Sequence, residues 1–193
     1  MSDTKTDFKA TLNLPRTEFP MKGDLVRREP GFIASWDGAR LYEQIVARAS
    51  DGDGGERPQF IMHDGPPYAN GRIHVGHCLN KVLKDIVVRF RNLRGATTEF
   101  IPGWDCHGLP IELAVDKEIG GEKKRQMGDV AFRAACRAYA EKFIDIQRAD
   151  FRRLGVLARW DAPYRTIDAT YEAAILRELG KFIHAGAVYR AKK

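Results

Sequence analysis

The stretch QFIMHDGPPYANGRIHVGH, residues 59–77, decides the fold, because it joins a strand pattern to a helix pattern through a loop rich in glycine and proline. Its opening residues, 59–63, are mostly apolar, which is typical of a short buried strand in a parallel sheet. After the loop, apolar residues recur at helical spacing: Leu79, Leu83, Ile86, Phe90 and Leu93. Gly95 then ends the predicted helix, and TTEFI (97–101) predicts a second strand. This order is a βαβ unit, so the expected fold class is α/β.

The composition is that of a globular chain, since its 193 residues are 44% hydrophobic, which is enough for a sizeable core. No apolar run is long enough to cross a membrane, and the start of the chain lacks the regions of a secretory signal. Cys78, Cys106 and Cys136 form no CxxC pair, which argues against a disulfide framework and a four-cysteine zinc site. The net charge of +6 says little about whether the partner is a polyanion, because acidic residues are interspersed almost everywhere along the chain. We expect a cytoplasmic protein with no membrane partner.

The rest of the chain divides into an N-terminal part and a longer α/β part. Residues 1–35 carry prolines and little periodicity, which predicts an extended arm lying over a core. Residues 37–49 have helical spacing, and the polar segment 50–58 ends that helix. We therefore expect an arm and helix at 1–56 and an α/β region at 57–193. Two further helices are predicted by the stripes Phe132, Cys136, Tyr139, Phe143, Ile146 and Tyr171, Ile175, Leu179, Phe182.

The loop before the long helix lies where an α/β sheet binds its ligand, beyond the carboxyl end of a strand. Unpaired N–H groups at the helix start and the nearby glycines favour an anion, so phosphate is the leading ligand. Neither GxGxxG nor GxxxxGK[ST] occurs, which argues against the usual dinucleotide site and a P-loop. His74 and His77 lie in the first helical turn, where both rings can face the ligand.

Three roles compete for His74 and His77 on spacing alone. They could donate hydrogen bonds to phosphate oxygens, bind a metal ion, or serve only as polar residues at the helix start. Metal binding ranks third, because Cys78 and His77 point apart on a helix and the HExxH spacing is absent. Asp105, at the end of the second strand, would face the same crevice and could hold an ammonium group, or it could be a turn residue.

HVGH (74–77) resembles the HIGH signature of the class I aminoacyl-tRNA synthetases. HDGPPYANGRIHVGHCLNKVLKDIVVRF (63–90) and PGWDCHGLPIE (102–112) are similar to the isoleucyl branch of this family in its bacterial form. The resemblance implies the first half of a Rossmann-like nucleotide-binding fold. It implies an ATP site at Asn70, His74, Gly76 and His77, an isoleucine site at Gly65, Pro66 and Asp105, and a framework role for Trp104, Cys106 and His107. Within these sets, the two histidines would contact phosphates, Gly76 the adenine, and Asp105 the α-ammonium group.

The activity that the resemblance implies is ligation of isoleucine to tRNA(Ile) through an isoleucyl adenylate formed with ATP. The isoleucine carboxylate is itself the nucleophile, so the site aligns reacting groups and stabilises phosphate charge, with Mg²⁺ sharing that load. Members of the family are several times longer, so we expect an N-terminal fragment, truncated near the editing insertion and inactive alone. Zinc is expected only in the missing C-terminal region, and the full-length enzyme is expected to be a monomer. Two other functions stay open: another nucleotidyltransferase with this histidine signature, and a metal-binding or structural module.

Overall fold

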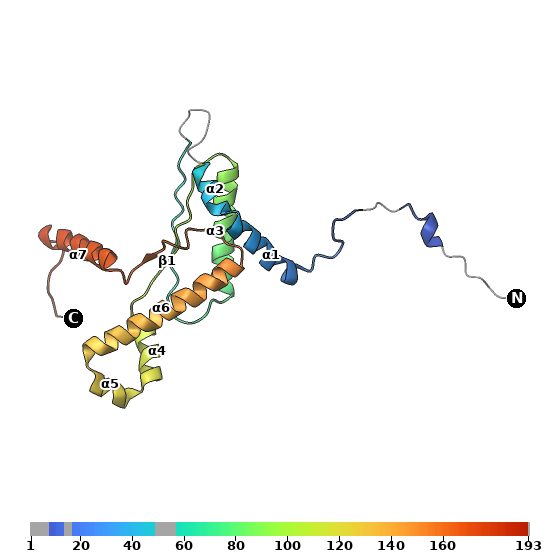
Figure 1. Ribbon diagram of the computed structural model, residues 1–193. Coiled ribbons are helices and arrows are strands. Elements are labelled where there is room, and N and C mark those ends of the chain that lie inside the picture. The colour runs from blue at the N-terminus through green and yellow to red at the C-terminus, as the bar shows by residue number, and fades with distance from the viewer. Residues whose placement is uncertain (1–7, 14–16, 49–56, 193) are drawn as a thin grey trace.

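The computed structural model describes residues 8–13, 17–48 and 57–192, and helices dominate these ranges (Figure 1). The predicted polar loop 50–58 therefore lies mostly outside the described residues. In chain order the elements are the 3-10 helix η1 (Phe8–Thr11), α1 (Leu25–Gly38), α2 (Leu41–Ala47), α3 (Val75–Leu93), β1 (Gly103–Trp104), α4 (Leu109–Ile119), α5 (Gly121–Met127), α6 (Asp129–Arg153), β2 (Tyr164–Arg165) and α7 (Ala169–His184).

Three parallel extended segments lie side by side near the centre of the molecule (Figure 1). The first spans residues 59–69, the second spans 97–105 and includes β1, and the third is β2. Their paired residues are Gln59 with Thr97, Tyr68 with Asp105, Gly103 with Tyr164, and Trp104 with Arg165. The second segment therefore lies between the other two, and α3 connects the first to the second. This arrangement confirms the predicted βαβ order and the α/β fold class.

The predicted strands are present as extended backbone, but their regular pairing lies elsewhere. The first two segments pair only at their ends, and β1 begins beyond the predicted strand 97–101. One cause is that Pro66 and Pro67 have no backbone N–H to donate to a ladder. Another is the register, because the two bridged residues are nine positions apart in the first segment and eight positions apart in the second. The prediction of two regular strands at 59–63 and 97–101 is therefore wrong.

The helix α3 ends as predicted, but its apolar stripe faces solvent. Gly95 has a φ of 87°, which glycine adopts without strain, and its N–H donates to the carbonyl of Asn92. An amphipathic pattern normally buries its apolar stripe, whereas here each stripe residue is at least half exposed: Leu79, Leu83, Ile86, Phe90 and Leu93. The face that packs inward carries Lys81, Asp85 and Val88. Both charged side chains have ion-pair partners there, as buried charges require.

The prediction of an extended arm over 1–35 is wrong for residues 25–35, because residues from Leu25 onward form α1. Pro30 lies inside this helix and removes one N–H from its ladder. The helix forms despite that loss, and its Glu29 pairs with Arg153 of α6 at 2.9 Å. Residues 17–24 are all exposed and extend away from the body rather than over a core (Figure 1). The predicted helix 37–49 is shorter than expected and corresponds to α2.

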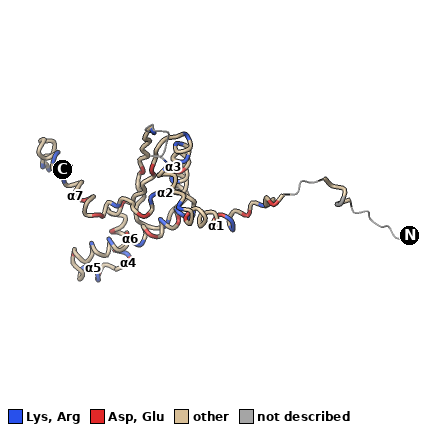
Figure 2. Tube along the Cα trace, turned by 45° about the horizontal axis from the view of Figure 1, so that its top comes forward, with Lys and Arg blue, Asp and Glu red and all other residues tan. Residues whose placement is uncertain are grey.

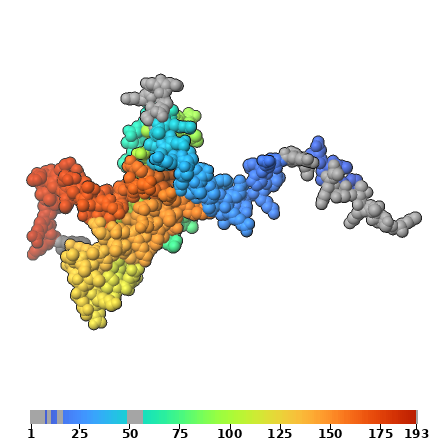
Figure 3. Space-filling view, in the orientation of Figure 1, coloured from blue at the N-terminus to red at the C-terminus, as the bar shows by residue number. Residues whose placement is uncertain are grey.

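The core lies between the extended segments and α6, and it is rich in aromatic side chains. Phe100, Trp104 and Phe151 are fully buried, and the rings of Phe151 and Trp160 stack with centroids 6.1 Å apart. The predicted helices at α6 and α7 are both confirmed. However, α7 buries no residue, and it projects from the body (Figures 1 and 3).

Charged residues of both signs are interspersed along the chain (Figure 2). Within the described ranges, none of the helices combines the length and the apolar composition needed to cross a lipid bilayer.

Candidate active site

The first turn of α3 is built around its two histidines. His74 is the N-cap residue, and its Nδ1 accepts a hydrogen bond from the N–H of Gly76 at 3.0 Å. In return, the N–H of His74 donates to Nδ1 of His77 at 3.2 Å. The two rings stack with centroids 3.9 Å apart. The histidines thus form a reciprocal capping box, in which they satisfy N–H groups that a helix start leaves unpaired.

This capping fixes the tautomer of both rings. A ring nitrogen that accepts a hydrogen bond carries no proton, so in neutral His74 and His77 the proton is on Nε2. The pKa of His77 is lowered, first by burial and then by the charges of His74 and Lys81, which favours the neutral form. No hydrogen bond among the described residues involves either Nε2. The helix start therefore presents two N–H donors to a ligand.

The geometry bears on the three roles considered for these histidines. Helix capping is real, but it uses only Nδ1 and so does not exclude ligand binding through Nε2. A metal ion would need a lone pair on Nε2, which this tautomer lacks. The ranges that the structure describes hold no group of three His, Cys, Asp or Glu side chains placed to bind a metal ion. The arrangement is therefore best suited to an acceptor such as a phosphate oxygen.

Gly76 makes the capping geometry possible. A Cβ at this position would lie 2.8 Å from Cε1 and 3.0 Å from Nδ1 of His74. Such contacts are too short for any side chain, so the ring of His74 occupies the space that a larger residue would fill. This close approach is a local reason for glycine here, in addition to the ligand contact expected from the sequence.

A buried charge cluster anchors the start of the loop. The Asp64 side chain is fully buried and forms ion pairs with Lys81 and with Lys84, the latter at 2.5 Å. The ammonium group of Lys81 lies 5.5 Å from the centre of the Phe100 ring. Burial lowers the pKa of Lys81, and the attraction of Asp64 opposes that shift. The hydroxyl of Tyr164 also donates to the Asp64 carbonyl at 2.9 Å, so this residue is held through both side chain and backbone.

The loop residues Gly65 and Pro66 follow directly after this anchor, and Asn70 is held from two sides. The hydroxyl of Tyr139 donates to Oδ1 of Asn70 at 2.8 Å, and Nδ2 of Asn70 donates to the Pro110 carbonyl at 3.4 Å. The Asn70 side chain is thus tied to α6 and α4. In this conformation it serves the framework of the loop.

Asp105 lies against the same loop. Its N–H donates to the Pro67 carbonyl at 2.9 Å, and its carbonyl accepts from the N–H of Ala69 at 2.8 Å. Its Oδ1 accepts from the N–H of His107 at 3.3 Å, so the alternative role as a turn residue is also realised. No hydrogen bond among the described residues uses Oδ2, which leaves that oxygen for a ligand. The structure therefore brings Asp105 to residues 67–69, whereas His74 lies farther along the loop.

The predicted framework residues are tied into the fold. Trp104 and Cys106 are buried, and burial raises the pKa of the Cys106 thiol, which argues against a reactive cysteine there. His107 is exposed, but its Nε2 lies 3.1 Å from the Thr166 carbonyl and 3.4 Å from a carboxylate oxygen of Glu172.

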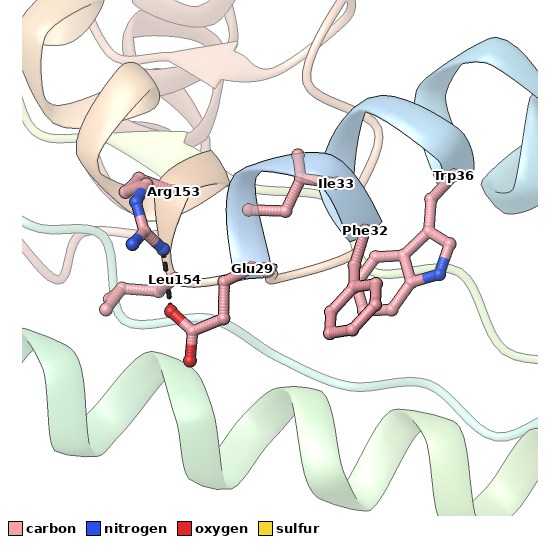
Figure 4. Close-up of a pocket in the computed structure, with 7 residues that line it drawn as sticks. Glu29, Phe32, Ile33, Trp36, Arg153 and Leu154 are labelled. Atoms are coloured by element: carbon pink, nitrogen blue, oxygen red, sulfur yellow. Dashed lines mark hydrogen bonds and ion pairs between the residues drawn. The ribbon is translucent and has the colours of Figure 1, made fainter. Parts of the chain in front are cut away.

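The clefts of the surface do not by themselves identify the site. A cleft of about 510 Å³ lies between α1 and the end of α6, where Glu29 pairs with Arg153 beside Phe32 and Trp36 (Figure 4). It contains none of the predicted site residues. A second cleft, of about 420 Å³, is lined by Cys106 and His107, next to Asp105 in the chain. The candidate site therefore rests on the chemistry of the loop and not on cleft size.

Sequence reasoning missed the residues that support the loop: Lys81, Lys84, Tyr139, Gln147 and Tyr164. One signal was available, because Lys81, Asp85 and Val88 are themselves spaced by four and three along α3. A polar stripe of this kind is normally read as the solvent face. Tyr164 and Gln147 gave no local signal, because their partners are distant in the sequence.

Residues 31–193 match the model of the family described as "tRNA synthetases class I (I, L, M and V)". The isoleucine–tRNA ligase of Nitratidesulfovibrio vulgaris (strain DP4) is 55% identical over 188 residues, which are 97% of this chain and 19% of that protein. The isoleucine–tRNA ligase of Aquifex aeolicus (strain VF5) is 54% identical over 195 residues, covering 100% of this chain and 20% of that protein. The chain thus spans about a fifth of the length of these curated relatives. Their names confirm the isoleucyl resemblance.

A solved structure shares the fold. The crystal structure of the ternary complex of Agrobacterium radiobacter K84 agnB2 LeuRS–tRNA–LeuAMS matches with a TM-score of 0.64 and 22% identity, over 89% of this chain and 19% of that chain. The match agrees with the predicted α/β class and the first half of a Rossmann-like fold. Since the family model covers most of the sequence, the chain belongs to the class I tRNA synthetases of the I, L, M and V group.

Proposed function

We propose that this chain carries the ATP- and isoleucine-binding part of an isoleucine–tRNA ligase. The observation that supports this most is the start of α3, where His74 and His77 use Nδ1 for capping and keep Nε2–H for a ligand. Two N–H donors beside the positive end of a helix suit the phosphates of a nucleotide. The relatives are named isoleucine–tRNA ligases, which supports isoleucine and a tRNA as the other two substrates in this proposal.

Adenylate formation, the first step of the proposed reaction, needs placement and not proton abstraction. The isoleucine carboxylate attacks the α-phosphorus of ATP, the bond to pyrophosphate breaks, and isoleucyl adenylate forms. A ribose hydroxyl of tRNA(Ile) then attacks the acyl carbon, its proton passes to the departing phosphate, and AMP is released. In this scheme His74 and His77 donate to phosphate oxygens on which negative charge develops. Such chemistry depends on how exactly the reacting groups are aligned.

Other residues of the loop and of the second segment would place the substrates. Asp105 would hold the α-ammonium group of isoleucine with its free Oδ2, and Gly65 and Pro66 would form one wall of the amino-acid pocket. Gly76 and Asn70 belong to the nucleotide side in this proposal. Asn70 would act through the position of the loop, because its amide is already bonded to Tyr139.

Magnesium is expected together with ATP, whose phosphate oxygens are the kind of ligand that Mg²⁺ prefers. It would neutralise part of the phosphate charge. In this proposal the phosphate oxygens of the nucleotide would hold the ion. An isoleucine–tRNA ligase of this kind would act in the cytoplasm, where tRNA is charged.

A chimera tests this function. Residues 1–193 replace the matching segment of the Aquifex aeolicus relative, and isoleucine-dependent exchange between ATP and pyrophosphate is measured. His74→Ala and His77→Ala should each slow exchange by about 10- to 1,000-fold, the range for losing a donor to developing charge. His184→Ala, which changes an exposed histidine in the last turn of α7, is the matched control and should leave exchange unchanged.

Asp105→Asn tests the amino-acid side in the same chimera. It removes a charge and keeps the shape, so isoleucine binding should weaken by roughly 10- to 150-fold while ATP binding stays within about threefold. Exchange that does not depend on any amino acid would favour another nucleotidyltransferase. Stoichiometric zinc that is lost in the double His74→Ala, His77→Ala variant would favour a metal-binding module.

A further inference from the structure

Gln147 is a fully buried amide in the middle of α6, and each polar atom of its side chain has a partner. Its Oε1 accepts from the indole N–H of Trp104 at 3.0 Å. Its Nε2 donates to the carbonyl of Tyr68 at 3.0 Å and to the carbonyl of Gly71 at 2.8 Å. One side chain therefore forms hydrogen bonds both to the second extended segment and to the histidine loop, which is the loop that leads to His74 and His77 at the start of α3.

The partners of Gln147 lie next to the residues proposed to bind the two substrates. Trp104 precedes Asp105, which is assigned to isoleucine, and Gly71 lies just before the histidines assigned to ATP. We propose that Gln147 is a positioning residue that sets the spacing between these two sides of the site. The catalytic part of this inference rests on the proposed function, whereas the positional part concerns the chain alone.

An amide is the group that this location requires. The indole N–H can only donate and the two carbonyls can only accept, so the side chain must supply one acceptor and two donors. Glutamate would bring a negative oxygen toward the carbonyls of Tyr68 and Gly71. Methionine has a similar length but would leave buried polar groups without partners, which is costly in a low-dielectric interior.

Two backbone hydrogen bonds report directly on this spacing. The N–H of Ala69 donates to the Asp105 carbonyl and the N–H of Asp105 donates to the Pro67 carbonyl, so these two hydrogen bonds join the loop to the second segment beside Gln147. The N–H of Phe60 and the N–H of Thr97 cross between the same two segments at their far end. A loss of positioning should weaken only the hydrogen bonds donated by Ala69 and Asp105. General destabilisation should also weaken those donated by Phe60 and Thr97.

Hydrogen exchange resolved by NMR on the 193-residue chain tests the positional part. In Gln147→Glu and Gln147→Met, exchange at Ala69 and Asp105 should accelerate at least about tenfold more than at Phe60 and Thr97. Gln44→Glu is the matched control, since the exposed Gln44 donates to the Ala39 carbonyl far from the loop. Equal acceleration at all four amides, or none, would overturn the proposal.

A measurement on the unchanged chain keeps the test decisive if a variant does not fold. The Nε2 protons of Gln147 should exchange with solvent at least about tenfold more slowly than those of the exposed Gln44, because Gln147 is fully buried and both of its protons are donated to backbone carbonyls. Equal rates for the two amides would overturn the assigned contacts.

The catalytic part is tested in the Aquifex chimera. Gln147→Met should lower kcat for pyrophosphate exchange at least about tenfold, while KM for ATP and for isoleucine changes less than about threefold. The reason is that each half-site stays intact and only their relative placement is lost. A rise in either KM without a fall in kcat would overturn this role. An unchanged chimera that shows no exchange would count against the proposed function, whereas the exchange rates of the amides would still decide the positional part.

Discussion

Replacing Gly76 by alanine probes the histidine cap most directly. A Cβ there would lie 2.8 Å from Cε1 of His74, so the ring has to leave its place over the backbone. Once displaced, it no longer accepts from the N–H of residue 76 and no longer stacks on His77. The substitution thus removes the cap without changing either histidine.

Two effects of opposite sign set the size of the change. Alanine in a helix is favoured over glycine by at most about 1 kcal/mol. Loss of an N-cap hydrogen bond costs about 1 kcal/mol, and loss of the ring contact about another 1 kcal/mol. The net result is a chain destabilised by about 1 kcal/mol. Gly31 provides the matched control, because it lies inside α1 and a Cβ added there would have no neighbouring atom within 4 Å. There alanine should stabilise by up to about 1 kcal/mol.

The assay is urea unfolding followed by far-ultraviolet circular dichroism. The free energy of unfolding should be about 2 kcal/mol lower for Gly76→Ala than for Gly31→Ala. Nitrogen NMR of the His74 ring should also show a change of tautomer, because Nδ1 loses the donor that kept it unprotonated. If Gly76→Ala is as stable as Gly31→Ala, the ring does not lie on the backbone and the capping argument is wrong.

Three further predictions concern charges around the loop. Acidification should loosen the start of α3, because burial lowers the pKa of His77 below its ordinary value of 6.5. The contribution of neutral His77 to the free energy of unfolding is therefore complete above pH 6.5 and is lost as the pH falls below that value. Proton NMR of the ring and of nearby amides can follow this change. Tyr164→Phe should cost about 1 kcal/mol and remove a late step from the alkaline ultraviolet titration, since burial first raises this pKa to about 12. Asp64→Asn should cost roughly 3 to 5 kcal/mol in urea unfolding because it leaves Lys81 buried without its partner, whereas Lys84→Met should cost about 1 kcal/mol. Similar losses for these last two variants would contradict the assignment of the buried pair.

The order of extended segment, loop, helix and extended segment around α3 could be predicted because it depends on local signals. The apolar spacing from Leu79 to Leu93 and the stop at Gly95 correctly indicated α3, and the flanking apolar runs indicated extended segments on either side. The loop between them marked the candidate site through its residue types. Those signals lie within a few residues of the features that they predict.

The orientation of α3 and the helix α1 could not be predicted in this way. Spacing shows that two faces of α3 differ, but which one packs inward depends on partners such as Asp64, whose carboxylate makes burial of Lys81 possible. Pro30 argued against a helix, yet α1 forms around it, because local propensity is only a weak guide to the structure of a segment within a fold. The pairing of the first two segments at their ends follows from the two prolines and the extra residue between bridges, which is a question of register.

The loop that leads to His74 and His77 is supported from distant parts of the chain. Lys81 reaches Asp64 across 17 positions of the sequence, Gln147 reaches Tyr68 across 79, and Tyr164 reaches Asp64 across 100. Each contact is a polar side chain that is at least partly buried and meets the loop at a different point. Burying such groups is expensive, but once all are paired they allow few alternative arrangements. A site that acts by alignment gains from this, because donors already in place need no reorganisation when the reaction occurs. In the proposed function, contacts from α3, α6 and β2 would therefore fix the positions of the two Nε2 donors before a nucleotide binds.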